Sequence, residues 1–283
     1  MLIPPRDGLD LEDYKILKPD SCRNKFISII IPAYNEAQRI GRTIQELNAF
    51  LHQRGLCYEL IVVNDGSRDN TSAAAKAAIE DYQVRNFTLI ELKNNQGKGS
   101  AVTSGVKQAT GDIIGFIDAD LPVDLTCIDS MIAAVEGGVD LAIGARDLKE
   151  SVINPNQNKI RLFAGRVFSH LINLVLFKEV FDTQCGVKFF KANPAKAIFE
   201  RLTIPGFGFD VEVIFLAVKF GLVIKRTPVK LVNTNGSRVR LWRDAVIMFT
   251  DLFKIRRNAG QGRYDLCGHR RGLIPNIVRN RGE

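Results

Sequence analysis

Two aspartates, Asp118 and Asp120, follow an apolar run in the segment GDIIGFIDADLP (111–122). On an extended chain, side chains spaced i, i+2 point to the same face, so the two carboxylates are expected to lie together. Two adjacent anions are unfavourable without a cation, and carboxylate oxygens suit a hard divalent ion such as Mg²⁺ or Mn²⁺. Such an ion often completes its shell with substrate phosphates. The pair therefore predicts a metal–diphosphate site, and the alternative role, capping the next helix, can be filled by Asp124.

Two more polar clusters could contribute to the same site. The segment NDGS (64–67) is by itself a good turn with a helix cap, and beside the aspartates it predicts a carboxylate that holds a base edge or a ribose hydroxyl. The segment NNQGKG (94–99) places glycines and Lys98 before a predicted helix, where free N–H groups and the helix dipole favour an anion. The GxxxxGK[ST] and GxGxxG spacings are both missing. Together the clusters predict a nucleotide pocket.

Apolar β-rich segments alternate with helical patterns along the first half of the chain. Strands are expected at 26–31, 59–64, 87–92, 112–117 and 139–143, and helices at 37–54, 70–83, 99–109 and 124–136. Continuous apolar strands separated by helices indicate parallel pairing with both faces covered, so the expected fold class is α/β with a doubly wound, mostly parallel sheet. Ligands bind at the carboxyl ends of such strands. Segments 32–36, 64–67 and 118–120 follow three of these strands and are expected to converge on one crevice.

The pattern changes after about residue 150, where a loop precedes two predicted amphipathic helices at 159–177 and 239–257. Each helix has an apolar stripe with aromatic residues, and the second has a basic flank. Such helices either pack on the core or lie on a membrane surface, and for 239–257 with the basic tail we favour the membrane. The expected organisation is an N-terminal arm (1–25), one α/β domain (26–235), an amphipathic interfacial helix (236–257) and a basic tail (258–283).

The chain of 283 residues carries a net charge of +8, and residues 254–283 hold eight Lys and Arg against one Asp and one Glu. A basic tail favours a polyanion, either an anionic membrane surface or nucleic acid, and a solvated tail has the same composition. A non-catalytic nucleic-acid-binding protein is the alternative from another function class. The phosphates of a nucleic acid would be repelled by three acidic strand ends around one crevice, so we expect no nucleic acid partner. The oligomeric state is left open.

Five cysteines, an odd number without CxxC spacing, favour a reducing compartment and speak against a zinc site or a disulfide framework. Residues 1–25 are polar and mixed in charge, which speaks against an N-terminal signal. No uncharged apolar run approaches the roughly 20 residues of a spanning helix. The expected location is cytoplasmic, peripheral on the cytoplasmic face of a membrane.

Five motifs occur in a fixed order along the chain: FISIIIPAYNEAQRI, ELIVVNDGSRDNT, NNQGKGSAV, GFIDADLP and DTQCGVKFF. Together they resemble the inverting family 2 glycosyltransferases with the GT-A fold, in particular the dolichyl- or polyprenyl-phosphate β-glucosyltransferases. The resemblance implies a metal-dependent hexosyltransferase that moves glucose from UDP-glucose to a polyprenyl phosphate with inversion and releases UDP. A GDP-mannose-dependent polyprenyl-phosphate mannosyltransferase, or a transferase acting on a saccharide or diacylglycerol hydroxyl, is the alternative.

The resemblance also assigns roles to residues by position. The metal and diphosphate would be held by Asp118 and Asp120. The residues expected at the donor nucleotide are Pro32, Tyr34, Glu36, Asp65 and Lys98. The residues expected at the acceptor phosphate are Arg146, Arg161, Gln184, Lys188, Ser237 and Arg238, and of these Arg146 is also a catalytic candidate, with Asp118, Asp120 and Asp210.

Whether the reaction needs a general base depends on the acceptor. Family 2 enzymes that act on hydroxyl groups use a carboxylate in the second half of the chain, for which Asp210 and Glu212 are the candidates here. A phosphate monoester has its second pKa near about 6, so at neutral pH it can attack without losing a proton. A phosphate acceptor therefore predicts that Asp210→Asn and Glu212→Gln retain substantial activity, whereas a hydroxyl acceptor predicts that one of them is inactive.

Overall fold

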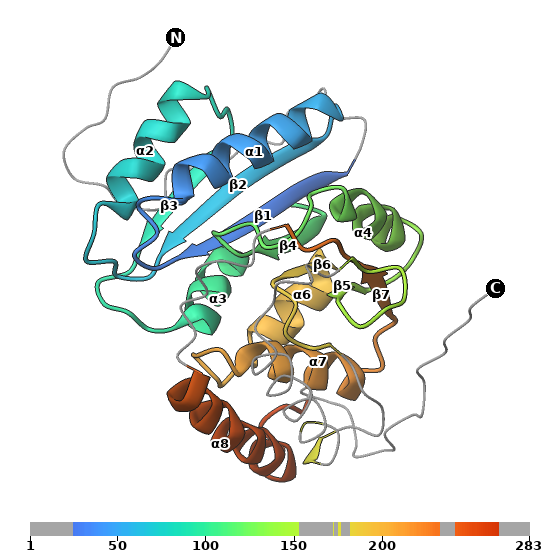
Figure 1. Ribbon diagram of the computed structural model, residues 1–283. Coiled ribbons are helices and arrows are strands. Elements are labelled where there is room, and N and C mark those ends of the chain that lie inside the picture. The colour runs from blue at the N-terminus through green and yellow to red at the C-terminus, as the bar shows by residue number, and fades with distance from the viewer. Residues whose placement is uncertain (1–24, 153–171, 173–174, 177–181, 233–240, 266–283) are drawn as a thin grey trace.

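A computed structural model describes residues 25–152, 172, 175–176, 182–232 and 241–265 (Figure 1). The strands are β1 (Phe26–Ala33), β2 (Cys57–Asn64), β3 (Phe87–Glu91), β4 (Ile113–Ile117), β5 (Leu141–Ala145), β6 (Val187–Lys191) and β7 (Ile224–Pro228). The helices are α1 (Ile40–Gln53), α2 (Thr71–Asp81), α3 (Lys98–Gln108), α4 (Cys127–Glu136), α6 (Ala192–Phe199), α7 (Phe209–Lys219) and α8 (Leu241–Gly260).

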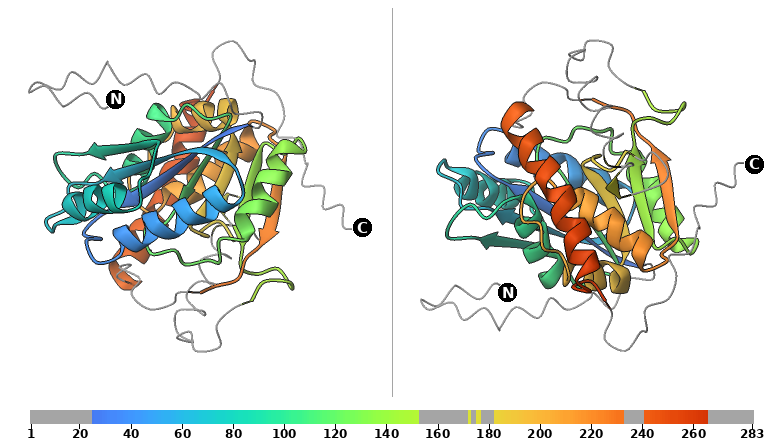
Figure 2. Two further views of the ribbon diagram at one scale, coloured as in Figure 1. Left: turned by 90° about the horizontal axis from the view of Figure 1, so that it is seen from above. Right: turned by 90° about the horizontal axis from the view of Figure 1, so that it is seen from below.

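The seven strands form one sheet in the order β3-β2-β1-β4-β6-β5-β7. Strand β6 runs antiparallel to both of its neighbours, β4 and β5, and every other pairing in the sheet is parallel. In Figure 2 helices cover both faces of the sheet. The expected fold class, a doubly wound and mostly parallel α/β sheet, is confirmed.

The core explains why these segments form a covered sheet. In β1, all of FISIIIPA except Pro32 is buried, as expected for a strand with helices on both sides. On one face, side chains of α1, α2 and α4 pack against the sheet. On the other face, side chains of α3, α6, α7 and α8 do so, and the α8 residues Leu252 and Ile255 are buried there.

The five predicted strands and four predicted helices of the first half are all present, with ends that differ by a few residues. Strands β6 and β7 and helices α6 and α7 were not predicted. The α7 sequence FDVEVIFLAVK is buried on nearly all sides, so it lacks the polar face that marks a surface helix. The helix predicted at 239–257 is present as α8. Most of 159–177 lies outside the described residues, but Ile172 is buried against the α6–α7 side of the core.

The chain remains part of the fold beyond the predicted interfacial helix, because Tyr264 is fully buried. The expectation against disulfides is wrong at Cys57, which is disulfide-bonded, whereas Cys127 and Cys185 are free and buried. Sequence spacing alone does not tell which distant cysteines meet in space. Among the described residues, no helix is both long and apolar enough to cross a membrane.

Candidate active site

The paired aspartates lie directly after β4, at the carboxyl end of the sheet's central strands. The Asp118 backbone N–H donates to the Gly186 carbonyl oxygen (3.1 Å), which joins β4 to the loop before β6. A Cβ on residue 186 would lie 2.2 Å from Asp118 Oδ2, so only glycine allows this close approach. The side chain of Asp118 is 30% exposed and that of Asp120 is 29% exposed. The backbone is therefore held in place at Asp118, and both carboxylates are open to a ligand.

The charges around the two aspartates differ. The Lys98 ammonium lies 2.7 Å from Asp118 Oδ1, whereas the Arg39 guanidinium lies 3.8 Å from Asp120 Oδ2. Burial raises the pKa of Asp120 above its usual range, and the charge of Asp118 raises it further, while Arg39 and Lys98 act in the opposite direction. The two carboxylates are thus close enough for the charge of Asp118 to raise the pKa of Asp120.

A divalent metal fits this donor set. Among the described residues, no cluster of three or more His, Cys, Asp or Glu side chains is arranged to enclose a metal. Two partly exposed carboxylates, two residues apart, match Mg²⁺ or Mn²⁺, which take one or two carboxylates and leave positions for phosphate oxygens. Asp118 and Asp120 would hold such an ion. Asp124 instead accepts hydrogen bonds from the Thr126 N–H (3.0 Å) and hydroxyl (2.7 Å) beside α4.

The predicted donor residues gather at the carboxyl ends of β1 and β2. Pro32 lies in β1 and is paired with Val63 of β2, and Tyr34 follows the strand. The Glu36 backbone N–H donates to Thr71 Oγ1 (2.8 Å), and its carboxylate pairs with Arg39 at 2.9 Å. The loop that contains Tyr34 and Glu36 is thereby attached to the start of α2.

Asp65 holds the loop that precedes α3. Its two carboxylate oxygens accept the backbone N–H groups of Gln96 (2.7 Å) and Gly97 (2.8 Å). Burial raises the pKa of Asp65, and these two hydrogen bonds partly offset that rise. Gly97 has φ +100°, and a Cβ there would lie 2.5 Å from the Pro205 carbonyl oxygen. Asp65 thus fixes the glycine-rich turn that presents Lys98.

Lys98 contacts both Asp118 and Asp210, and Lys188 contacts Asp210. Lys98 Nζ is 2.7 Å from Asp118 Oδ1 and 3.5 Å from Asp210 Oδ2. Lys188 Nζ is 2.5 Å from Asp210 Oδ1 and also donates to the Cys185 carbonyl oxygen (3.0 Å). Burial alone would lower the pKa of Lys98, but the charges of Asp118 and Asp210 raise it above its ordinary value. Lys98 therefore stays a cation.

Lys188 was expected to meet the acceptor phosphate, but its side chain is fully buried. Its position suits the neutralisation of Asp210 rather than contact with a molecule that arrives from solvent. Arg146, the second expected acceptor residue, keeps 40% of its side chain exposed. Arg161, Ser237 and Arg238 lie outside the described residues.

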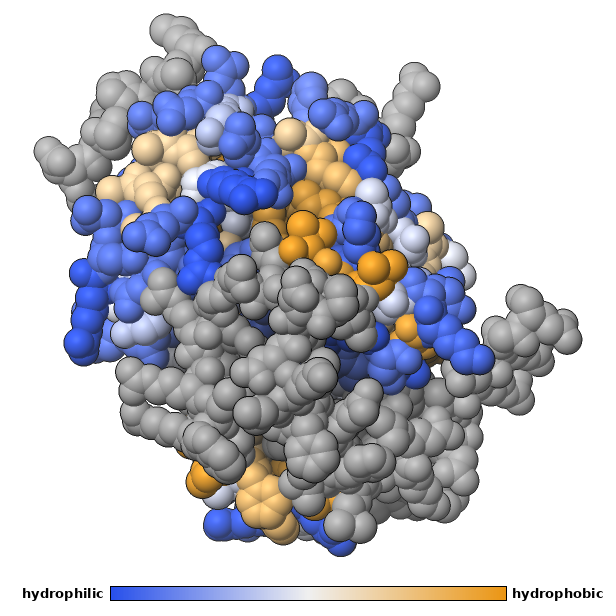
Figure 3. Space-filling model, viewed as in Figure 1, coloured by the Kyte–Doolittle hydropathy of each residue, from blue (hydrophilic) through white to orange (hydrophobic). Residues whose placement is uncertain are grey.

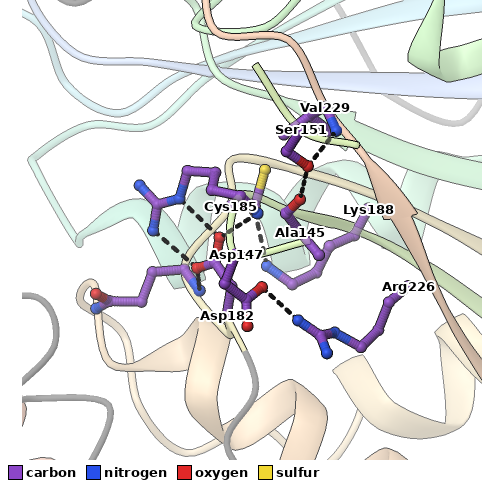
Figure 4. A network of polar contacts seen from close by, with 10 residues as sticks. Ala145, Asp147, Ser151, Asp182, Cys185, Lys188, Arg226 and Val229 are labelled. Atoms are coloured by element: carbon purple, nitrogen blue, oxygen red, sulfur yellow. Dashed lines mark hydrogen bonds and ion pairs between the residues drawn. The ribbon is translucent and has the colours of Figure 1, made fainter. Parts of the chain in front are cut away.

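Arg146 forms a clamp with Asp182, and Asp182 is labelled in Figure 4. Its Nε and Nη2 donate to the two Asp182 oxygens (2.7 and 2.8 Å), and its backbone N–H donates to Oδ2 as well (2.9 Å). A second pair, Arg226 with Asp147, lies next to the clamp and ties β7 to the end of β5. The Arg146–Asp182 clamp holds the Asp182–Gly186 loop against the end of β5, and Gly186 in turn supports Asp118.

Gln184 lies in the same loop. Its backbone N–H donates to Asp182 Oδ1 (3.3 Å), and its side-chain amide is 3.7 Å from the Met248 sulfur of α8.

Two residues that the sequence did not single out, Asp182 and Arg39, support the site. Both stand inside the quoted motifs DTQCG and NEAQRI, but no local spacing reveals their partners.

Both candidate bases are already engaged by other residues. Both oxygens of Asp210 already face lysine ammonium groups. Glu212 is fully buried and accepts hydrogen bonds from the Thr203 N–H and hydroxyl, the Ile204 N–H and the Tyr264 hydroxyl. Asp210→Asn would disturb two lysines, and Glu212→Gln would disturb the core. The two substitutions therefore do not discriminate cleanly between a phosphate and a hydroxyl acceptor.

The fold, a mostly parallel seven-stranded sheet with helices on both faces, matches one class of protein, the GT-A glycosyltransferases. The chain belongs to glycosyl transferase family 2, whose family model matches residues 28–199. It is therefore a glycosyltransferase. The five motifs had indicated this family, and the prediction is confirmed.

Several curated proteins resemble the chain over most of its length. A dolichyl-phosphate beta-glucosyltransferase of Dictyostelium discoideum is 30% identical over 243 residues, which are 82% of this chain and 74% of that protein. The proteins of the same name from Drosophila melanogaster and Saccharomyces cerevisiae are each 32% identical, covering 81% and 82% of this chain and 74% of the relative.

Solved structures share the fold. The glucosyl-3-phosphoglycerate synthase of Mycobacterium tuberculosis in complex with phosphoglyceric acid gives a TM-score of 0.63 at 18% identity, covering 82% of this chain and 80% of that one. A complex of the same enzyme with Mn²⁺, UDP and glucosyl-3-phosphoglycerate gives 0.59 at 19% identity, covering 82% and 78%. At these identities the likeness establishes the fold alone.

Proposed function

We propose that this glycosyltransferase moves glucose from UDP-glucose to a polyprenyl phosphate, with inversion, and releases UDP and polyprenyl-phosphate-glucose. The relatives named dolichyl-phosphate beta-glucosyltransferase support the sugar and the acceptor. The observation that carries the proposal is the engagement of both candidate bases, Asp210 by two lysines and Glu212 by buried donors. An acceptor that is already an anion needs no base.

The reaction follows from the charges of the reactants. An oxygen of the acceptor phosphate attacks the anomeric carbon of glucose from the face opposite to UDP. The new carbon–oxygen bond forms as the bond to the β-phosphate of UDP breaks, and the bonding electrons leave with UDP. No proton has to be removed from the acceptor, because a phosphate monoester is largely a dianion at neutral pH.

The residues of this chain serve the donor and the leaving group. Asp118 and Asp120 would bind a divalent ion, which offsets charge on the departing diphosphate when it is bound. A Mn²⁺–UDP complex of a GT-A structural neighbour supports a divalent ion for this site. Asp65 holds the turn that presents Lys98 at the same corner, and Pro32, Tyr34 and Glu36 would hold the uracil and ribose.

We also propose that the protein acts at a membrane surface, with α8 as the contact. Four apolar residues of this helix are exposed: Val246 (63%), Ile247 (43%), Phe249 (39%) and Phe253 (50%). Apolar surface is visible in Figure 3 at the lower edge, where α8 lies in Figure 1. Lys254, Arg256 and Arg257 are exposed on the last turns of α8. Exposed aromatics beside cations match an anionic lipid surface, where a polyprenyl phosphate resides.

A transfer assay tests the proposal. The full chain is incubated with Mn²⁺, polyprenyl phosphate and radiolabelled UDP-glucose or GDP-mannose, and the lipid is extracted into organic solvent. We expect label in the organic phase from UDP-glucose only. Label from GDP-mannose alone would replace the proposed sugar, and no lipid label from either donor would exclude the lipid acceptor.

The same assay tests the metal assignment with a pair of variants. Asp120→Ala removes one of the two proposed metal ligands and should reduce turnover at least about 100-fold, because metal charge stabilisation contributes several kcal/mol. Asp81→Ala, at the exposed end of α2, removes an equal charge far from the site and should leave turnover unchanged. Activity of Asp120→Ala close to that of Asp81→Ala would show that the metal assignment is wrong.

A further inference from the structure

Four side chains at the active site form a row of alternating charge: Asp118, Lys98, Asp210 and Lys188. Lys98 Nζ lies 2.7 Å from Asp118 Oδ1 and 3.5 Å from Asp210 Oδ2. Lys188 Nζ lies 2.5 Å from Asp210 Oδ1. The two aspartates and two lysines sum to zero. Each inner member of the row therefore has an oppositely charged neighbour on both sides.

The two ends of this row differ in freedom. Lys188 is fully buried and is held by two acceptors, Asp210 and the Cys185 carbonyl oxygen. Asp210 is only 5% exposed. At the other end, Lys98 is 14% and Asp118 30% exposed. The Lys188–Asp210 end is thus held in place, and the Lys98–Asp118 end faces the ligand.

Lys98 has the freedom to change partners. Its ammonium is on a flexible four-carbon stem with three donors. It lies 5.8 Å from the Phe116 ring centre and 5.5 Å from that of Phe209, contacts that attract a cation without fixing its direction. Its distance to Asp210, 3.5 Å, is longer than a good charge-assisted hydrogen bond. The strongest hold on Lys98 is therefore Asp118, a proposed metal ligand.

A divalent ion bound to Asp118 would carry the same sign of charge as the Lys98 ammonium on that carboxylate. Like charges a few ångströms apart repel strongly where water is limited. The diphosphate of the donor brings new negative charge to the same corner, so it offers Lys98 another partner. Asp210 keeps the ammonium from leaving the site while this exchange takes place.

We propose that Lys98 is an exchangeable counterion: it neutralises Asp118 until a divalent ion takes that carboxylate, and then pairs with the donor diphosphate, with Asp210 as its fixed anchor. This inference rests on the proposed use of a metal and a nucleotide diphosphate. It predicts that the metal and the nucleotide bind cooperatively. Metal alone has to displace Lys98, whereas metal with nucleotide gives Lys98 a replacement partner. The coupling is reciprocal, because each ligand raises the affinity for the other by the same factor.

Binding measurements on the full chain test this exchange without turnover. Calorimetry gives the Kd of Mn²⁺ alone, and the Kd of UDP at saturating Mn²⁺, for the wild type and Lys98→Met. We expect Lys98→Met to bind Mn²⁺ alone about 5- to 10-fold more tightly, because its competitor is gone, and to bind UDP about 10-fold more weakly. If Lys98 only contributed contacts to the ligands, Lys98→Met would instead bind both Mn²⁺ and UDP more weakly than the wild type.

Two further variants control for charge and fold. Lys107→Met removes a lysine from the exposed end of the same helix and should change neither Kd. Lys98→Arg keeps the charge and should bind Mn²⁺ alone as the wild type does. An unchanged or weaker Mn²⁺ affinity in Lys98→Met, in a protein with a wild-type circular dichroism spectrum, would overturn the exchange. Failure of the wild type to bind UDP with Mn²⁺ would instead overturn the proposed function.

Discussion

Glu212 is a carboxylate whose surroundings suit a structural role. Four donors surround it, and the shortest contact is the Tyr264 hydroxyl at 2.5 Å. Burial, followed by the hydrogen bond to Glu212, raises the pKa of Tyr264 to about 12, so the hydroxyl remains a donor. Glu212 joins α7 to the 203–204 segment and to Tyr264 beyond α8. These contacts give the carboxylate two residues after Asp210 a structural role.

Replacing Glu212 with glutamine should destabilise the protein. The amide would direct two N–H groups at neighbours that are themselves donors, and each unsatisfied buried donor costs about 1–3 kcal/mol. We expect Glu212→Gln to lower the free energy of unfolding by about 2–4 kcal/mol, measured by urea denaturation. Glu136→Gln, at the exposed end of α4, is the control and should have almost no effect. Equal stabilities of the two variants would contradict the structural role.

The Arg146–Asp182 clamp should make stability depend on pH. Burial raises the pKa of Asp182, but the hydrogen bonds and charge of Arg146 lower it more, so the net pKa lies below the ordinary value of 3.8. A lowered acid pKa contributes stability above the unfolded value, and that stability is lost as the pH falls through the folded value. Since Arg146 is 40% exposed, solvent screening limits the contribution to about 1–2 kcal/mol.

Asp182→Asn tests this dependence. At pH 7 the variant should unfold about 1–2 kcal/mol more easily than the wild type. The difference should shrink as the pH falls below about 4, because Asp182 in the wild type then takes up a proton. Urea denaturation at several pH values between 7 and 3 measures the difference. A difference that stays constant over this range would show that the charge of Asp182 is not the cause.

Helix α8 has buried apolar residues and exposed apolar residues. Leu252 and Ile255 are buried in the core, whereas Phe249 and Phe253 are exposed and contact each other, with ring centres 5.1 Å apart. Removal of the exposed pair should therefore change membrane binding without unfolding the helix. The proposed lipid contact and the packing contact can be separated by mutation.

A double variant, Phe249→Ser with Phe253→Ser, should bind anionic vesicles at least about 10-fold more weakly than the wild type, because each buried phenylalanine contributes about 1.5–3 kcal/mol. Co-sedimentation with vesicles of phosphatidylglycerol measures the binding. Thr250→Ala, on an exposed position of the same helix, is the control. Binding should also weaken at high salt, because the basic flank contributes. Equal sedimentation of the double variant and the control would exclude α8 as the contact.

Ligand binding should stabilise the whole molecule, because the proposed site joins loops from β1, β2, β4 and β6. A ligand at 100 times its Kd adds about 2.7 kcal/mol to the stability of the folded state. For a domain of this size, that corresponds to a rise in Tm of roughly 5–10 °C. We expect this rise with UDP and Mn²⁺ together, followed by differential scanning fluorimetry. EDTA should abolish most of it, and a UDP-dependent rise that survives EDTA would contradict metal-assisted binding.

Much of the fold and part of the site followed from local sequence patterns. The run IIGFI is apolar throughout and FISIIIPA is apolar except for Ser28, and such runs form strands that are covered on both faces. The carboxylates of Asp118 and Asp120 and the turn before Lys98 were found because their chemistry is carried by neighbours in sequence. The i, i+2 spacing and the glycine–lysine turn need no knowledge of distant residues.

Other features depended on contacts between residues far apart in sequence, and only the tertiary structure decided them. Arg146 and Asp182 are 36 residues apart, and Glu212 and Tyr264 are 52 apart. The antiparallel insertion of β6 between β4 and β5 brings Lys188 beneath Asp210. The sequence by itself thus determined five of the seven strands, the family motifs and the paired aspartates, because these rest on periodicity and adjacency. The partners of Lys98, Asp210 and Glu212 depend on how the elements pack, since burial and ion pairing arise only when distant segments meet.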